Sequence, residues 1–179
     1  WQELAETMLP RRADFTAERA PGAKRTEHQY DSTPMQAARG LAAALDGLLK
    51  PKTANWFKIK TDDEAVNESD PVKRWLEMAE LRMRGALYDP RARFLQRSAE
   101  VDIDLVVFGT GILFIGESAS GRDLRFRSVH LKEAYLAESA DGDIDTVFRV
   151  LTMSARQAAQ TWGQERLGGV AVVGDAVAA

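Results

Sequence analysis

Three aspartates at alternate positions, Asp141, Asp143 and Asp145, have the spacing of the first ligands in a calcium-binding loop. Such a loop also requires a glycine at its sixth position, for a sharp turn, and a bidentate glutamate at its twelfth. Thr146 and Thr152 occupy those two positions in this chain. The pattern therefore favours a hairpin turn over a metal site.

Several glycines between positions 109 and 121 invite comparison with phosphate loops and nucleophile elbows. A phosphate loop needs a Gly-Lys pair, because the lysine reaches the phosphates, and the sequence has none. Phe114 stands where a dinucleotide fingerprint has its third glycine. The segment Gly116-Glu-Ser-Ala-Ser-Gly121 misses the Gly-x-Ser-x-Gly elbow by one residue. We interpret these glycines as a helix end and a strand turn, and we expect no cofactor.

The other candidates for catalysis lack partners in the sequence. The chain has no cysteine and two histidines, His28 and His130. His130 and Glu133 supply two ligands, with no third in view, whereas a zinc site takes at least three from the protein. Asp102 and Asp104 are two residues apart on a predicted helix, so they point in different directions and do not form a paired acid and base. We therefore predict no catalytic residue, no metal ligand and no enzyme activity.

The composition limits the classes of protein that remain. A chain of 179 residues with 45% hydrophobic and 28% charged residues is expected to form one domain with a core of its own. Its net charge of −3 gives no overall basic field that attracts nucleic acid or an acidic membrane. The longest apolar stretch, 105–115, is shorter than the roughly 18 residues of a membrane helix. We expect no membrane partner.

Apolar residues at helical spacing predict the elements of the first two thirds of the chain. They predict helices at 1–9, 33–49 and 70–87, and a further helix from Asp89-Pro90 to Gly109. A long connection fills 10–32, and the alternating segment 55–60 predicts a short strand. Trp56 and the other aromatic residues lie within apolar patterns, which favours packing in a core or an interface over stacking on bases.

After Gly111 the apolar residues recur at every second position, which is the spacing of a strand. Strands are predicted at 112–117, 124–127, 129–138 and 146–152, followed by a helix at 155–162. The fold class is therefore α+β, with amphipathic helices followed by a small antiparallel sheet. We expect one region, 1–167, that is helical at 1–109, β-rich at 110–153 and helical again at 154–163. Residues 168–179 contain only Gly, Ala, Val and one Asp and are predicted to be a flexible or non-native tail.

An ordered series of short motifs runs through most of the chain. Trp1 and Leu9-Pro10 precede a basic loop and the string Tyr30-Asp-Ser-Thr-Pro34, and a small-residue helix, Pro51 and Trp56-Phe57 follow. Later come Phe108-Gly-Thr-Gly111, the passage 129–149 and Trp162. Over about 1–168 this series resembles the N-terminal wing region of portal proteins, the head-to-tail connecting proteins of short-tailed bacteriophages.

The resemblance implies a structural role in the virion. Proteins of this family form rings, typically of twelve subunits, at one capsid vertex, and they are made in the cytoplasm of the bacterial host. Their partners are capsid protein, terminase and tail or adaptor proteins, and DNA passes through the channel of the ring. The wing is not expected to touch DNA directly. The stem, tunnel loop and clip lie further along in the family, so this chain is expected to be a fragment or a truncated prophage copy.

A ring also implies contacts between subunits. The basic loop supplies Arg11, Arg12, Lys24 and Arg25, which we expect to contact acidic residues of an adjacent subunit, and Tyr30 and Trp56 are further candidates for the interface. Two alternatives remain. One is a phage or prophage-derived adaptor domain that forms no ring, and the other is a small hydrolase with an unrecognised site.

Overall fold

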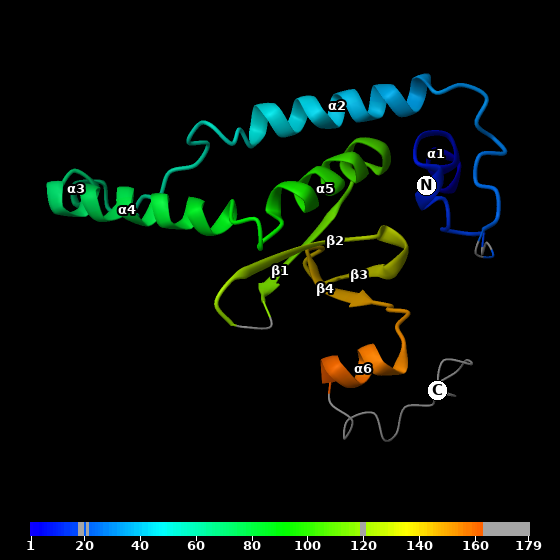
Figure 1. Cartoon of the computed structure of the whole chain (residues 1–179). Coiled ribbons are helices and arrows are strands. Elements are labelled where there is room, and N and C mark those ends of the chain that lie inside the picture. The colour runs from blue at the N-terminus through cyan, green and yellow to red at the C-terminus, as the bar shows by residue number, and fades with distance from the viewer. Residues whose placement is uncertain (18–19, 21, 119–120, 163–179) are drawn as a thin grey trace. The chain divides into compact units, whose positions relative to one another are not determined.

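The computed structural model describes residues 1–17, 20, 22–118 and 121–162. The tail predicted at 168–179 lies outside these residues. The chain divides into two compact units, the first at Trp1–Lys132 and the second beginning at Glu133. Figure 1 shows the order of the elements. Six α-helices and two antiparallel pairs of strands make up the described part, which confirms the predicted α+β class.

The described residues of the first unit form five α-helices and one pair of strands. In chain order its elements are α1 (Gln2–Met8), η1 (Pro10–Arg12), α2 (Thr33–Leu49), α3 (Glu64–Asn67), α4 (Asp70–Leu87), α5 (Phe94–Phe108), β1 (Ile112–Glu117), β2 (Leu124–Val129) and η2 (Leu131–Glu133). The second unit continues with β3 (Ala134–Glu138), β4 (Ile144–Arg149) and α6 (Ala155–Trp162).

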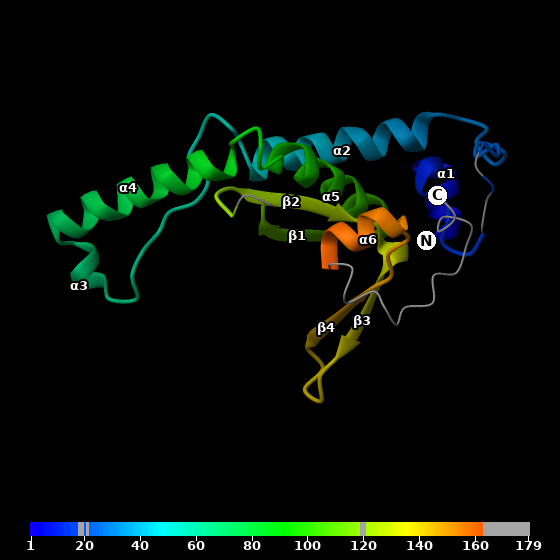
Figure 2. The same cartoon turned by 60° about the horizontal axis from the view of Figure 1, so that its bottom comes forward.

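Helix α5 is the centre of the first unit. It packs against α2 on one side and against β1 and β2 on another, as Figure 2 shows. The small side chains of Ala38 and Ala42 on α2 are buried in this contact, which allows the two helices to approach closely. Val107 and Phe108 of α5 belong to the same core cluster as Ala38. A second cluster joins Phe94, at the start of α5, to Phe126 of β2.

The N-terminal segment closes over the C-terminal end of α5. The indole N–H of Trp1 donates to the carbonyl oxygen of Phe108 at 3.1 Å. The ring of Phe15 lies edge-on to that of Phe108, with centroids 5.3 Å apart. The side-chain oxygen of Gln2 accepts a hydrogen bond from the backbone N–H of Phe15 at 2.8 Å. Residues at the start of the chain thus cover the core of the first unit.

Two glycines set the turn from α5 into β1. Gly109 has a φ of +77°, and its N–H donates to the carbonyl of Leu105 at 2.9 Å, which confirms the predicted helix end. Gly111 is placed so close to α5 that a Cβ atom would lie 2.9 Å from the backbone oxygen of Val101. Strands β1 and β2 then pair antiparallel, from Ile112 opposite Val129 to Glu117 opposite Leu124.

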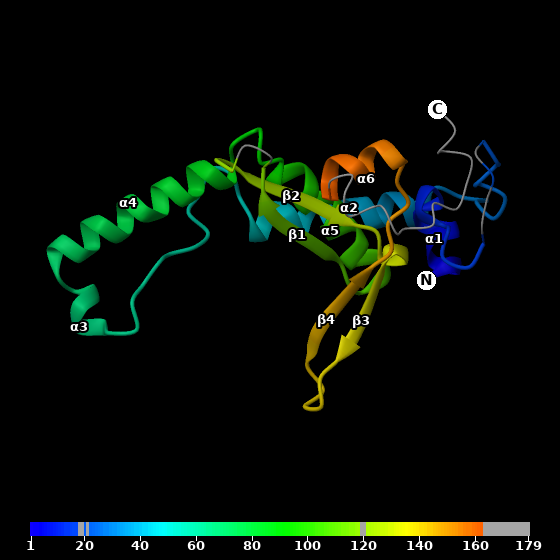
Figure 3. The ribbon, with the colours of Figure 1, turned by 90° about the horizontal axis from the view of Figure 1, so that it is seen from below.

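In the described residues, the second unit consists of one hairpin followed by α6. Strands β3 and β4 pair with Tyr135 opposite Phe148, and the N–H of Val150 donates to the carbonyl of Glu133 at 2.7 Å. Figure 3 shows the two strands of this hairpin side by side. The sequence predicted one sheet, but β1–β2 and β3–β4 form separate two-stranded sheets. The predicted third strand begins late because Leu131–Glu133 is a 3-10 turn.

Two further predictions of local structure are wrong. The segment 55–60 is not a strand, because no other segment pairs with it, among the residues described. The N–H of Ile59 donates instead to the Glu80 carboxylate at 2.7 Å. The helix predicted from Asp89 begins only at Phe94, because the Asp89 carboxylate caps a tight turn through the N–H of Arg91. In the described residues no helix is long and apolar enough to cross a membrane.

Candidate functional site

Two near-motifs of the sequence, around Ser118 and Asp141, lie in hairpin turns, as predicted. At the turn that contains Ser118, the N–H of Ser118 donates to the carbonyl of Asp123 at 2.8 Å. The turn around Asp141 is closed by the N–H of Ser139, which donates to the carbonyl of Asp143 at 2.7 Å. Gly142, with a φ of +85°, supplies the left-handed position there. Within the described residues no group of His, Cys, Asp and Glu is arranged to hold a metal ion.

The two aspartates of α5 point to different partners, as their spacing predicted. Asp102 accepts from the Lys50 ammonium at 2.5 Å, and Lys50 also donates to Ser98 and lies 3.4 Å from Asp46. Asp104 is fully buried and pairs with Arg12. Lys50 comes from the end of α2 and Arg12 from the N-terminal segment, so each ion pair joins α5 to a different part of the chain. These are structural contacts.

The carboxyl groups on α5 are shifted in opposite directions. Burial raises the pKa of Asp104, and the nearby Arg12 guanidinium offsets only part of that rise. For Glu100, burial also acts to raise the pKa, but the Ser128 hydroxyl and the Arg97 guanidinium more than offset it, so this pKa is lowered. The two groups lie one turn apart on the same helix, and their pKa shifts differ because Asp104 is more deeply buried and Glu100 has more donors around it.

The predicted interface residues of the basic loop lie in two different surroundings. Arg12 turns inward to Asp104. Arg25 pairs with Asp14 at 2.9 Å and donates to the backbone oxygen of Arg11, so Arg11 and Arg25 lie together. Both Arg11 and Lys24 are exposed. Arg12 and Arg25 therefore already have acidic partners within their own chain.

The two aromatic residues predicted for the interface also have different surroundings. Tyr30 is 92% exposed. Trp56 stacks on the ring of Phe94 with an interplanar angle of 8°, and its indole N–H donates to the Tyr88 hydroxyl at 2.8 Å. It remains 38% exposed. Trp56 thus holds the connection after α2 against the start of α5 and keeps one edge on the surface.

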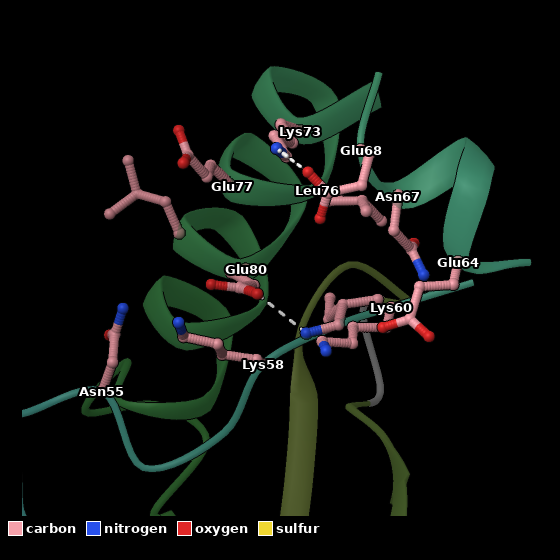
Figure 4. A pocket seen from close by; sticks show the side chains of 12 residues that line it. Asn55, Lys58, Lys60, Glu64, Asn67, Glu68, Lys73, Leu76, Glu77 and Glu80 are labelled. Atoms are coloured by element: carbon pink, nitrogen blue, oxygen red, sulfur yellow. Dashed lines mark hydrogen bonds and ion pairs between the residues drawn. The ribbon is translucent and has the colours of Figure 1, made fainter. Parts of the chain in front are cut away.

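An open groove runs between α4 and the segment 55–60. Its volume is about 580 Å³. In Figure 4 the Glu80 carboxylate reaches across to the backbone of this segment, and Lys73 reaches Glu68 at 2.7 Å. The charged side chains that line it are of both signs and are mostly exposed: Lys58, Lys60, Glu64, Glu68, Lys73, Glu77 and Glu80. A groove with balanced, solvated charges favours no particular ligand, and the sequence did not point to it.

Several large apolar side chains are exposed on α4 and on the β3–β4 hairpin. On α4, Trp75, Met78 and Leu81 are all more than half exposed. On the β3–β4 hairpin the cross-strand pairs Tyr135–Phe148 and Leu136–Val147 are also largely exposed. A single exposed apolar residue needs no explanation, but contiguous ones mark surfaces that bind other proteins. The sequence placed Trp75 in an apolar helical pattern that packs in a core or an interface, and it did not single out Met78 and Leu81.

Comparisons with known proteins identify one family. The model of a family described as bacteriophage head to tail connecting protein matches residues 1–172. The portal protein of Salmonella phage epsilon15 is 27% identical over 168 residues. A probable portal protein of Bordetella phage BPP-1 is 25% identical over 168 residues. Each match covers 93% of this chain and 30% of the relative, so the chain spans less than a third of the length of these two curated relatives.

Proposed function

Because this chain belongs to the family of bacteriophage head to tail connecting proteins, we propose that it is a structural part of a portal ring at one vertex of a phage capsid. The observation that carries this proposal is the family match over 1–172, which includes both units of the structure. The chain serves assembly in this proposal and catalyses no reaction.

The exposed surfaces support a role in assembly. Apolar side chains on α4 and on the β3–β4 hairpin present large areas that water solvates poorly. Neighbouring subunits of a ring bury such areas. A ring arises when one surface of a subunit binds a different surface of the next and the rotation closes. The other partners that we propose are capsid protein, terminase and tail or adaptor proteins, with DNA passing through the channel of the ring.

The basic loop and the two aromatic residues remain part of this proposal. Arg11, Lys24 and Tyr30 are exposed, and Trp56 keeps an exposed edge, so all four lie on the surface that a neighbouring subunit can contact. Arg12 and Arg25 also have intrachain partners. They act at such an interface by holding the loop in place, and any contact with the neighbour is added to their existing ion pairs.

The location in the virion tests the proposal. Antibodies raised against the folded chain are applied to purified virions of the phage that carries this sequence and are detected with gold particles in the electron microscope. We expect label at one vertex per particle, at the end that bears the tail. Label spread over the whole capsid, or particles without label, would contradict the proposal. Light scattering tests the alternative of an adaptor that forms no ring. Such an adaptor should be a monomer or dimer in solution, whereas a portal should form a large ring.

A further inference from the structure

The β1–β2 hairpin carries arginine side chains on the face that points away from α5. Ser128 of β2 donates to the Glu100 carboxylate of α5. Successive side chains of a strand point to opposite faces of a sheet, so Arg125 and Arg127 lie on the outer face. Phe114 of β1 is directly opposite Arg127 and is 52% exposed. The outer face of this hairpin thus combines one exposed ring with two guanidinium groups.

Few carboxylates oppose the arginines of this hairpin. Three of its arginines form no ion pair in the described part of the chain: Arg122 in the turn, and Arg125 and Arg127 in β2. Two aspartates beside the hairpin, Asp89 and Asp123, both pair with Arg91. Glu117 lies opposite Leu124, which places it on the face toward α5. We call the three arginines, together with the exposed ring of β1, the arginine face.

The β3–β4 hairpin of the second unit ends in an acidic tip, residues 138–145. This stretch contains four acidic and no basic residues. All four are exposed and form no ion pair among the residues that the structure describes: Glu138, Asp141, Asp143 and Asp145. The cation at the other end of the hairpin, Arg149, pairs with Glu133 at 2.8 Å. The charge that the tip presents is therefore negative throughout.

Both surfaces have a defined shape and an apolar centre. The N–H of Ser139 donates to the carbonyl of Asp143 at 2.7 Å and closes the turn of the tip. Ile144, at the end of this turn, is 58% exposed. On the arginine face the Phe114 ring lies over Gly116, where a Cβ atom would be 2.9 Å from it. Surfaces that are ordered before binding lose little conformational entropy when they meet.

We propose that the acidic tip of one copy of this chain binds the arginine face of a second copy. The Ile144 side chain then packs on the Phe114 ring, and the carboxylates of the tip pair with the three arginines around that ring. An apolar centre with a polar rim is the usual arrangement of a protein interface. Opposite charges also steer two such surfaces toward each other and fix their register.

A second copy fits the arginine face better than a nucleic acid does. The chain has a net charge of −3, which opposes its approach to a polyanion. The tip supplies both carboxylates for the arginines and an apolar side chain for the exposed ring. The two surfaces are different, so each copy can bind two neighbours, which is the heterologous geometry from which rings are built. The inference therefore rests on the proposed function and adds to it the surfaces that meet.

Charge reversal tests the contact from both sides. We expect the wild type to associate beyond a dimer in sedimentation velocity over a series of concentrations. The face variant Arg122→Glu/Arg127→Glu and the tip variant Asp141→Lys/Asp143→Lys should each associate about tenfold more weakly, or weaker still. None of these four side chains forms a hydrogen bond or an ion pair in the described part of the chain, so the circular dichroism spectrum should not change.

A matched control reverses two arginines elsewhere in the first unit. Arg74→Glu/Arg82→Glu changes exposed residues of α4 that form no ion pair within the described residues, and it alters the net charge as much as the face variant does. This control should associate like the wild type. The single variants Phe114→Ser and Ile144→Ser remove the apolar centre and should each weaken association by about tenfold. Both side chains are more than half exposed, so the fold should be kept.

Mixing the face variant with the tip variant tests whether the contact joins different copies. Each variant alone has a face and a tip of the same sign of charge. In an equal mixture the acidic tip of the face variant meets the arginines of the tip variant, and the new lysines meet the new glutamates. The mixture should therefore recover the association that each variant has lost. Higher salt should weaken the wild type and the mixture alike.

Four outcomes would overturn the proposal. They are a wild type that stays monomeric, a mixture that does not recover, an α4 control that weakens as much as the face variant, and a tip variant that associates normally. A short DNA duplex tests the other occupant: wild type that binds it through the arginine face, with normal association of the tip variant, would assign this face to nucleic acid. Gold label at the capsid vertex with normal association of both variants would overturn this contact alone and leave the proposed function standing.

Discussion

At the scale of single residues, the structure depends on cations that reach the carboxylates of α5. Lys50 is 16% exposed in its side chain and Asp102 is 11% exposed, so this pair is largely removed from water. Lys73 and Glu68 form an ion pair of similar length on the surface. Removing one partner of a buried pair leaves an uncompensated charge, whereas an exposed charge is solvated by water.

We predict that Asp102→Asn lowers the free energy of unfolding by about 2 to 4 kcal/mol, because the Lys50 ammonium then lies in the interior without its nearest carboxylate. Chemical denaturation monitored by circular dichroism measures the change. The matched variant Glu68→Gln alters the exposed pair and should leave the free energy nearly unchanged. Equal effects of the two substitutions would show that burial does not govern these pairs.

The pH dependence of stability should differ in sign between Asp104 and Glu100. The pKa of Asp104 is raised on folding, so its favourable contribution is complete below the unfolded pKa and is lost as pH rises through the folded pKa. The pKa of Glu100 is lowered, so its contribution is complete above the unfolded pKa and is lost as pH falls through the folded pKa.

We therefore predict that the stability of Asp104→Asn relative to the wild type increases from about pH 3 to about pH 7. For Glu100→Gln the relative stability should decrease over the same range. Unfolding in urea at several pH values gives both differences. Two curves with the same slope would contradict the assignment of opposite shifts. Two carboxyl groups on one helix are thus expected to change stability with pH in opposite directions, and no sequence pattern distinguishes them.

At the scale of elements, glycines mark the ends that the sequence predicted best. Gly109→Ala should lower the free energy of unfolding by about 1 kcal/mol, because alanine is disfavoured at a φ of +77°. Gly85 lies inside α4 with open space around it, so Gly85→Ala should raise stability by about 1 kcal/mol. Thermal unfolding of the two variants should shift in opposite directions, and a loss of stability in both would show that the conformation of Gly109 is not the cause.

The elements that were predicted correctly are those whose signal is local. Gly109 ends α5 by its own backbone geometry, and Pro34 begins α2 because its missing N–H is not needed there. The strand expected at 55–60 is not formed. Alternation of apolar and polar residues indicates an extended backbone only, and among the described residues no other segment pairs with this one. For Trp75 the sequence left core packing and interface packing open, because periodicity defines the apolar side of a helix and says nothing of what covers it.

At the scale of the whole molecule, the two units differ in how much apolar surface they bury. The first unit has two core clusters around α5, whereas the hairpin of the second exposes Tyr135, Val147 and Phe148. A hairpin of two strands is marginal by itself in water. The family could be anticipated from the ordered series of motifs, because the match spans 1–172 and depends on the series as a whole rather than on any single residue.

We predict that backbone amides of β3 and β4 exchange with deuterium at least tenfold faster than those of α5, because opening the hairpin exposes little additional apolar surface. Mass spectrometry of peptides from the dilute protein measures both regions in one experiment. Peptides from β1 and β2, which pack on α5, serve as the internal comparison and should be protected. Equal protection of the two hairpins would contradict the prediction.

The closure of the core by the first residues of the chain has a consequence for proteolysis. A protease that removes 1–15 leaves every residue of α5 in place but takes away Arg12, Trp1 and Phe15 together. The carboxylate of Asp104 then loses the guanidinium that pairs with it, together with the two rings that cover the end of α5. Loss of 1–15 therefore opens this part of the core to water and leaves the Asp104 carboxylate without its arginine.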